Sequence, residues 1–233
     1  MQPTLTGKTA LVTGASGGLG TTVTRVLLEA GAQVAGLAPQ IRQSDFNHPA
    51  FFPLPAQISS PDSAGSAVAA AVAHLGKLDI VAHLVGGFAG GTRVDETDYA
   101  AWQRMFDLNL NSAFLLLRAA IPHMRRAHTG RIIAIGSRAA LDPGPTLAAY
   151  NASKAALVSL IRTIALENKD AGITANVILP GTMDTPGNRQ SSPQADFSQW
   201  VQPATVASLI VWLAGDQAGD VTGAVIPVYG KGL

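Results

Sequence analysis

The stretch Thr13-Gly14-Ala15-Ser16-Gly17-Gly18-Leu19-Gly20 follows a short apolar run, Thr9 to Thr13, and opens a helical pattern that Gly31 closes. Glycines at three positions of this stretch permit a tight turn and let the backbone approach a ligand closely. The helix that follows offers free N–H groups and the positive end of its dipole to a pyrophosphate. The spacing G-x-x-x-G-x-G, after a strand and before a helix, therefore predicts a turn that binds a dinucleotide.

Beyond this turn, short β-rich runs alternate with helical patterns along the whole chain. The runs are apolar throughout, as expected when both faces of a sheet are covered. Strands separated by helices imply right-handed crossovers and a parallel sheet. We predict an α/β fold, with residues 1–233 forming a single doubly wound, Rossmann-like domain. The further strands are expected at Gln33 to Leu37, Ile80 to Val85, Arg131 to Ile135, Thr174 to Leu179 and Ala224 to Val228.

Composition excludes several classes of function. Sixteen basic and fifteen acidic residues nearly cancel, and no long basic run points to nucleic acid or to an anionic membrane. Cysteine is absent, so disulfides and thiol chemistry are excluded. No apolar stretch reaches the roughly 20 residues that a membrane span needs. The first residues lack the basic flank of a signal peptide. We expect a cytoplasmic protein with no metal site.

Two helical patterns, Trp102 to Met124 and Ala149 to Glu167, are apolar nearly all round. A helix without a polar face is buried on two sides. One side can pack on the sheet, and the other needs a partner, most simply a second copy of the chain. Charged residues make up only 13% of the sequence, which agrees with surface buried between subunits. We therefore expect a homo-oligomer.

Tyr150-Asn151-Ala152-Ser153-Lys154 places a phenol and an ammonium four residues apart, on one face of a helix. An unperturbed tyrosine has a pKa of about 10, too high for efficient proton exchange near neutral pH. A cation beside the phenol stabilises the phenolate and lowers that pKa. The pair is thus a candidate general acid/base.

The longest irregular segment runs from Thr185 to Pro203 and is rich in Pro and Ser. A long loop inside a compact domain is often a lid or a binding loop. We expect residues 185–203 to form the substrate loop.

Together these motifs resemble the short-chain dehydrogenase/reductase family over essentially the whole chain. The resemblance rests on the glycine motif, on Tyr150 with Lys154, and on four further features at matching spacings. These are Asn109 within Asp107-Leu108-Asn109-Leu110, Ser137 after a strand, Pro180-Gly181 with Thr185, and Val221-Thr222-Gly223.

The resemblance implies a seven-stranded parallel sheet and a catalytic set of four residues. Tyr150 would exchange a proton with the substrate oxygen, and Lys154 would lower its pKa and bind the nicotinamide ribose. Ser137 would hold the substrate oxygen, and Asn109 would anchor a water that links Lys154 to solvent. The residues implied at the cofactor, besides Tyr150 and Lys154, are Gly14, Ser16, Gly18, Leu19, Gly20, Ala38, Arg42, Gln57, Ile58, Val85, Gly86, Pro180, Gly181, Met183 and Thr185.

The chain departs from the family pattern at several positions. His83-Leu84-Val85-Gly86 stands where the family often has Asn-Asn-Ala-Gly, and we expect His83 to be a packed sheet residue. Gln57 replaces an Asp near the adenine, and Ala38 replaces the Asp that binds the ribose hydroxyls in NAD-preferring members. An acidic residue there would repel a 2′-phosphate, so its absence favours NADP over NAD weakly. Arg42 is the nearest cation for that phosphate.

Two segments, Val85–Gly91 and Asp184–Trp200, resemble dihydropteridine reductase more closely. That group lacks the catalytic serine, so Ser137 argues against a simple transfer of its activity. We expect an apolar pocket with walls from three side chains, and two arginines that face an anionic group or a carbonyl. The pocket residues are Phe88, Met183 and Trp200, and the arginines are Arg138 and Arg189.

The leading interpretation is NAD(P)-dependent interconversion of a small-molecule carbonyl and a secondary alcohol. Pterin reduction is one alternative. Reduction of 3-oxoacyl groups on a carrier protein is another, in which Arg125 and Arg126 meet an acidic partner. A non-catalytic dinucleotide-binding regulator is the alternative from another class. The family implies a homotetramer, with a dimer as the other possibility.

Overall fold

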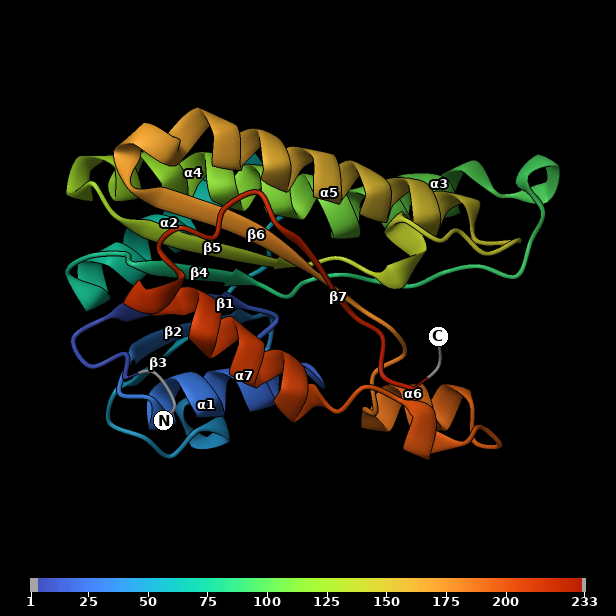
Figure 1. The fold of residues 1–233 in the computed structure, drawn as a ribbon, viewed down its shortest axis with the longest axis horizontal. Helices are drawn as coiled ribbons and strands as arrows, with labels where there is room; N and C mark the ends of the chain where they lie inside the picture. The colour runs from blue at the N-terminus through green and yellow to red at the C-terminus, as the bar shows by residue number, and fades with distance from the viewer. Residues whose placement is uncertain (1–3, 232–233) are drawn as a thin grey trace.

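The computed structural model describes residues 4–231 and contains a parallel sheet of seven strands within that range. The strand order is β3-β2-β1-β4-β5-β6-β7 (Figure 1). The bounds are Thr9–Thr13 for β1, Gln33–Ala38 for β2, Phe51–Pro55 for β3, Ile80–His83 for β4, Gly130–Ile135 for β5, Ile173–Pro180 for β6 and Val225–Val228 for β7.

Helices cover both faces of this sheet, which confirms the predicted doubly wound fold. Helices α1 and α7 lie on one face, and α2, α4 and α5 lie on the other (Figure 1). Each face of the sheet has its own hydrophobic core, and alternate residues of a strand pack into the two cores. Val12 packs with α1 and α7, and Leu11 packs with α2, α4 and α5. The bounds are Gly20–Glu29 for α1, Pro61–Leu75 for α2, Tyr99–Phe106 for α3, Ser112–Ala127 for α4, Ala148–Asn168 for α5, Pro186–Ser191 for α6 and Pro203–Ala214 for α7.

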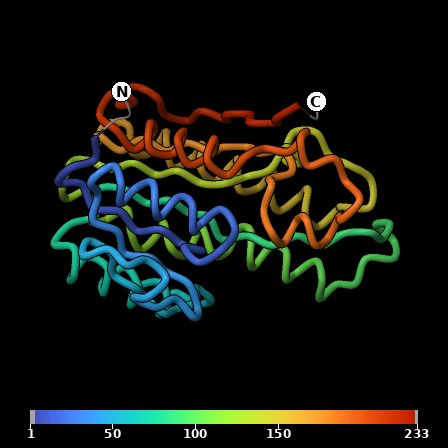
Figure 2. The backbone as a smooth tube through the Cα atoms, turned by 90° about the horizontal axis from the view of Figure 1, so that it is seen from below, coloured from blue at the N-terminus to red at the C-terminus, as the bar shows by residue number. Residues whose placement is uncertain are grey.

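The strand order reverses at β1, which pairs with β2 on one side and with β4 on the other. In such sheets a crevice forms beyond the carboxyl ends of the strands at the reversal. The segment that follows β4 and the segment that contains α6 extend beyond the sheet at this same end, as both views show (Figures 1 and 2). The site therefore lies at this end.

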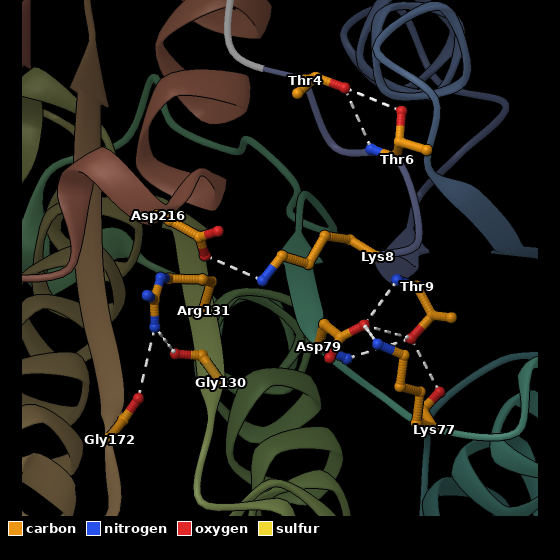
Figure 3. A network of polar contacts seen from close by, with 10 residues as sticks. All are labelled: Thr4, Thr6, Lys8, Thr9, Lys77, Asp79, Gly130, Arg131, Gly172 and Asp216. Carbon is orange, nitrogen blue, oxygen red and sulfur yellow. Dashed lines mark hydrogen bonds and ion pairs between the residues drawn. The ribbon is translucent and has the colours of Figure 1, made fainter.

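A polar network ties the opposite ends of the strands together (Figure 3). The buried carboxylate of Asp79, just before β4, accepts bonds from the backbone N–H of Thr9 at 2.8 Å and from its hydroxyl at 3.2 Å. Lys77 forms an ion pair with the same carboxylate at 2.9 Å, and Lys8 pairs with Asp216 at 2.9 Å. The contacts between Asp79 and Thr9 hold β1 and β4 in register, and so set the relative positions of their carboxyl ends.

Three local predictions need correction. Strand β3 was not among the expected strands, because Pro53 and Pro55 break the pattern of a strand. Strand β4 ends at His83, two residues before the expected end. The helix expected from Trp102 to Met124 is interrupted by a π-helical segment, Asp107–Asn111, called the π-turn below.

Within residues 4–231, no helix has both the length and the apolar character needed to cross a membrane.

Candidate active site

The glycine-rich segment forms a tight turn between β1 and α1, called the phosphate turn below. Gly14 has a φ of +69°, and its N–H donates to the carbonyl of Leu37 at 2.8 Å. A side chain at Gly20 would put its Cβ 1.9 Å from the carbonyl oxygen of Gly14. The N-terminus of α1 has no side-chain cap; the N–H of Thr21 donates to the carbonyl of Gly17 at 2.9 Å, and the neighbouring N–H groups can bind an anion. This cradle fits the dinucleotide that the sequence predicts.

The segment 185–203, expected to be the substrate loop, begins directly against the phosphate turn. A Cβ built at Gly18 would stand 2.9 Å from Cβ of Thr185, the residue that caps α6. The hydroxyl of Thr185 accepts from the N–H of Asn188 at 3.3 Å, which fixes the first turn of α6. Segments some 170 residues apart in sequence thus meet at the crevice.

Asn109 is placed by the π-turn. An inserted residue of this kind widens one turn of a helix, and such turns are frequent at functional sites. The Asn109 amide is fully buried; its oxygen accepts from the N–H of Gly87 at 2.8 Å, and its nitrogen donates to the carbonyl of Gly87 at 3.1 Å. The same nitrogen donates to the hydroxyl of Ser153 at 3.0 Å. Asn109 therefore joins the segment after β4 to helix α5.

Helix α5 carries Tyr150 and Lys154 on one face, as their spacing predicted. The hydroxyl of Ser153 donates to the carbonyl of Tyr150 at 2.9 Å, and so extends the Asn109 contacts to the tyrosine. The ammonium of Lys154 is 4% exposed and donates to the carbonyl of Ile135 at 3.0 Å. A Cβ at Gly86 would stand 3.0 Å from Nζ of Lys154 and 2.9 Å from Oδ1 of Asn109. The absence of a side chain at Gly86 leaves room for both groups.

Ser137 follows β5, and its side chain faces the phenol of Tyr150. The hydroxyl oxygen of Ser137 accepts from the N–H of Ala139 at 3.2 Å, so its own proton remains available to a ligand or to Tyr150. The ring of Phe88 meets the ring of Tyr150 edge to face, with centroids 5.0 Å apart. The phenol thus lies between an aromatic wall and a hydroxyl.

The pKa values at this centre differ from the sequence-based expectation in one respect. Burial lowers the pKa of Lys154 to about 8. Burial also raises the pKa of Tyr150, and a hydrogen bond with Ser137 opposes that rise. The lowered tyrosine pKa expected from Lys154 is not found, because desolvation of the phenolate outweighs the favourable contacts. Burial therefore shifts both pKa values towards the uncharged forms, while Lys154 keeps its charge below about pH 8.

A cleft of about 1,070 Å³ opens beside these groups. Tyr150, Lys154 and Ser137 line it, as do the three expected wall residues Phe88, Met183 and Trp200. Of the residues expected at the cofactor, Gly86, Pro180 and Gly181 also line the cleft. The remaining ones lie outside its lining: Gly14, Ser16, Gly18, Leu19, Gly20, Ala38, Arg42, Gln57, Ile58, Val85 and Thr185.

The two arginines expected to face a ligand are engaged within the chain. Arg189 forms a bidentate pair with Asp184, with one bond of 2.8 Å, and its guanidinium lies over the ring of Phe197. The expectation for Arg189 is therefore wrong. The same pair holds the pKa of Asp184 at about 2. Arg138 does line the cleft, but it forms an ion pair with Asp142 at 2.8 Å and lies over the ring of Tyr229.

Several cleft residues were missed by the sequence reasoning. Asn188 and Ser191 enter the lining from α6, and Tyr229 enters it from the segment after β7. A signal for α6 was present: Thr185 followed by Pro186 is a helix cap followed by a first-turn proline. Reading that signal would have placed Asn188 and Ser191 on a helix that faces the crevice. No comparable signal marks Tyr229.

The ribose end of the crevice lies at the end of β2. Ala38 is buried and closes this strand, while the Arg42 side chain is exposed and its backbone N–H donates to Asp45 at 2.9 Å. Val85 backs the phosphate turn, since a Cβ at Gly14 would lie 3.4 Å from its nitrogen. Ile58 is half-buried against the core on the α2 side.

Comparisons with known proteins agree with this geometry. A family model described as short chain dehydrogenase matches residues 8–196. D-β-hydroxybutyrate dehydrogenase from Rhizobium meliloti is 29% identical over 252 residues, covering 96% of this chain and 97% of that protein. 3β-hydroxysteroid dehydrogenase 1 from Eggerthella lenta is 33% identical over 249 residues, covering 99% and 95%. The crystal structure of a 3-ketoacyl-(acyl-carrier-protein) reductase from Brucella melitensis, complexed with NADH, superposes with a TM-score of 0.89 at 26% identity and covers 99% of this chain and 100% of its own.

Proposed function

This chain belongs to the short-chain dehydrogenase/reductase family and is an NAD(P)-dependent oxidoreductase; we propose that it interconverts a carbonyl and a secondary alcohol, with Tyr150 as the general acid/base. The observation that carries the proposal is the convergence of the side chains of Tyr150, Ser137 and Lys154 on one cleft. Two relatives are named as dehydrogenases of hydroxylated compounds and a third as a ketoacyl reductase, which supports the same reaction class.

In the reductive direction, the hydroxyl of Tyr150 gives its proton to the carbonyl oxygen of the substrate. The hydroxyl of Ser137 donates a hydrogen bond to that oxygen, on which negative charge develops. Lys154 stabilises the phenolate that remains, and Asn109 holds Gly87 and Ser153 in place around it. Bound NAD(P)H would supply the hydride to the carbonyl carbon. In the oxidative direction the phenolate takes the proton of the alcohol.

The direct test removes the proton from position 150. Tyr150→Phe is expected to lower carbonyl-dependent oxidation of NAD(P)H by about 10²- to 10⁴-fold, the usual contribution of a general acid. Cofactor binding, followed by fluorescence, should persist because the phosphate turn is intact. Tyr99→Phe is the matched control, since Tyr99 is 70% exposed and lies outside the cleft. Turnover that survives Tyr150→Phe unchanged would remove Tyr150 as the acid/base.

Three statements about assembly and organisation belong to the same proposal. Residues 1–233 act as one domain, with 185–203 as its substrate loop. The chain forms a homotetramer through the outer faces of α4 and α5, where Phe114 is 48% exposed and Leu166 is 74% exposed. Light scattering at micromolar concentration tests the assembly, and a monomeric mass would contradict it. NADP is proposed as the preferred cofactor, with Arg42 at its 2′-phosphate.

The alternative of a carrier-bound acyl substrate gains no support from the two adjacent arginines. Arg125 donates to Asn168 at 2.6 Å, and Arg126 donates to the carbonyl of Pro122 at 3.2 Å. Both lie at the end of α4 remote from the cleft, on the side where the strands begin (Figure 1). A quinonoid dihydropterin should be assayed as a substrate beside ketones, because the two segments that resemble dihydropteridine reductase contribute Phe88 and Trp200 to the cleft.

A further inference from the structure

His83 is a fully buried side chain that lies between the phosphate turn and the π-turn. It ends β4, and its register partners are Thr13 in β1 and Ala134 in β5. A buried imidazole needs partners for both ring nitrogens, because an unpaired polar atom in the core costs free energy. The two partners of His83 come from the two elements that it separates.

The first partner is Thr13, the residue that opens the phosphate turn. Oγ1 of Thr13 lies 3.0 Å from Nδ1 of His83. The same oxygen accepts the N–H of Leu84 at 3.2 Å. A hydroxyl has one proton, and the remaining neighbour for that proton is Nδ1. Nδ1 of His83 is therefore an acceptor, and in the neutral ring the proton resides on Nε2.

The second partner is Ser112, the first residue of α4. Its oxygen lies 3.4 Å from Nε2 of His83, and its own proton is donated to the carbonyl of Leu108 at 2.7 Å. Each donor in the series is used once: Leu84 N–H to Thr13, Thr13 to His83, His83 to Ser112, and Ser112 to Leu108. The hydrogen bonds run in one direction from the phosphate turn to the π-turn.

The π-turn passes these constraints to the catalytic centre. Leu108, which receives the last bond, directly precedes Asn109, and Asn109 holds Gly87 and Ser153. The ring remains neutral, since burial and the nearby ammonium of Lys154 lower the pKa of His83 to about 3. A neutral ring preserves both the acceptor at Nδ1 and the donor at Nε2 across the working pH range.

We propose that His83 is a positioning residue that couples the phosphate turn, through Thr13, to the π-turn that carries Asn109, through Ser112. The proposal rests on the proposed function for the roles of those two elements. One arm of the imidazole positions the turn that binds the cofactor. The other arm positions the residues around Tyr150 and Lys154. The asparagine common in the family at this position is shorter than histidine, so its side chain can reach only one of these two partners.

Two substitutions separate the arms. The amide of Asn occupies roughly the position of Nδ1, and the amide of Gln roughly that of Nε2. His83→Asn keeps the Thr13 arm, so kcat should fall about tenfold while the KM for the cofactor stays within about twofold. His83→Gln keeps the Ser112 arm, so the cofactor KM should rise about tenfold with kcat within about threefold. His83→Leu should show both losses.

The experiment measures kcat and cofactor KM for these variants, with thermal melts to establish that each one folds. Ser112→Ala should reproduce the kcat loss of His83→Asn, and the double variant should lose no more than either single one. His128→Asn, at the exposed C-cap of α4, is the matched control, because Asn tolerates the left-handed backbone there. Equal changes in kcat and KM across the Asn and Gln variants, or changes in melting temperature alone, would overturn the proposal.

A second readout does not depend on turnover. In protein labelled with ¹⁵N-histidine, the His83 signals, assigned by their loss in His83→Asn, should report a neutral ring protonated at Nε2 from pH 5 to 9. An Nδ1-protonated ring, or titration near pH 6.5, would overturn the proposal. If the wild type turns over no carbonyl, the proposed function fails; the labelled spectra and the cofactor dissociation constants of the Asn and Gln variants still decide the coupling.

Discussion

The two ends of the crevice are built in opposite ways. At the catalytic end, Asn109 is fully buried and Lys154 is 4% exposed, and both make hydrogen bonds within the chain. At the ribose end, Ala38 offers no polar side-chain atom, and Arg42 is exposed and makes no ion pair with any residue in the range 4–231. The chemistry is thus prepared before any ligand binds. The proposed preference for NADP rests on one solvated cation, Arg42.

The largest effect is expected from disrupting the catalytic end. Lys154→Met removes the ammonium but keeps a long apolar stem in a buried site. We expect kcat to fall about 10²- to 10⁴-fold, because the phenolate of Tyr150 loses its cation. Steady-state oxidation of NAD(P)H at saturating carbonyl measures the change. Lys169→Met, at the exposed end of the same helix, should leave kcat intact. A comparable loss in that control would mean that the effect is not local.

The next largest effect is expected from introducing an acidic side chain at the ribose end. Ala38→Asp places a carboxylate where the 2′-phosphate of NADP would lie, and like charges repel. We expect the KM for NADPH to rise about 30-fold or more, with the KM for NADH nearly unchanged, since such clashes cost several kcal/mol. Ala38→Asn has the same size without the charge and is the control. If Asn acts as strongly as Asp, crowding rather than charge explains the result.

A change of pH tests the catalytic end without any mutation. Lys154 has a pKa of about 8, so its charge is present below that pH and is lost above it. Carbonyl reduction should therefore fall by about tenfold per pH unit above pH 8, where Tyr150, with its raised pKa, remains protonated. A rate that stays constant to pH 10 would contradict the role of the ammonium.

The contribution of Lys154 to stability should move the other way as the pH rises. Between pH 8 and the ordinary lysine pKa near 10.5, the unfolded chain binds more protons at this residue than the folded chain does. The contribution of Lys154 to the free energy of unfolding therefore rises with pH across this window. Denaturant titrations of wild type and Lys154→Met at pH 7.5 and 10 measure this contribution by difference.

The smallest effect is expected from Arg42. An exposed arginine contributes little to binding at physiological salt, so Arg42→Ala should raise the KM for NADPH by about 3- to 10-fold and leave NADH unaffected. Arg25→Ala, on the exposed face of α1, is the control. Equal small effects on both cofactors would refute a role at the 2′-phosphate and would leave the ribose end without an identified cation.

Sequence alone predicted most of the fold because the patterns that specify it are local. Glycines 14, 18 and 20 sit between a strand and a helix, and the structure places them in the expected turn. Strand β3 was not predicted, because Pro53 and Pro55 are unusual in a strand. The π-turn was not predicted either, because the apolar pattern around Asp107–Asn111 is equally compatible with a continuous α-helix.

The site was predicted less completely, because residues distant in sequence determine whether a charged side chain pairs within the chain or faces a ligand. Arg189 was expected at the ligand, but Asp184 and Phe197 engage it instead. The spacing of Tyr150 and Lys154 predicted their shared face correctly. It could not predict the raised pKa of the tyrosine, which follows from how deeply the fold buries the ring.

The prolines of β3 have a consequence for the behaviour of the chain in concentrated solution. β3 is the last strand at its edge of the sheet, and the N–H of Val34 in β2 bonds to the carbonyl of Ala50, just before it. The N–H of Phe51 donates instead to the carbonyl of His48. The backbone N–H and C=O groups at the odd-numbered positions of β3 therefore point away from β2. Pro53 and Pro55 occupy the next two of these positions, and a proline has no backbone N–H to donate to another strand. A strand from another molecule would find few donors there, so this edge of the sheet is protected from edge-to-edge aggregation.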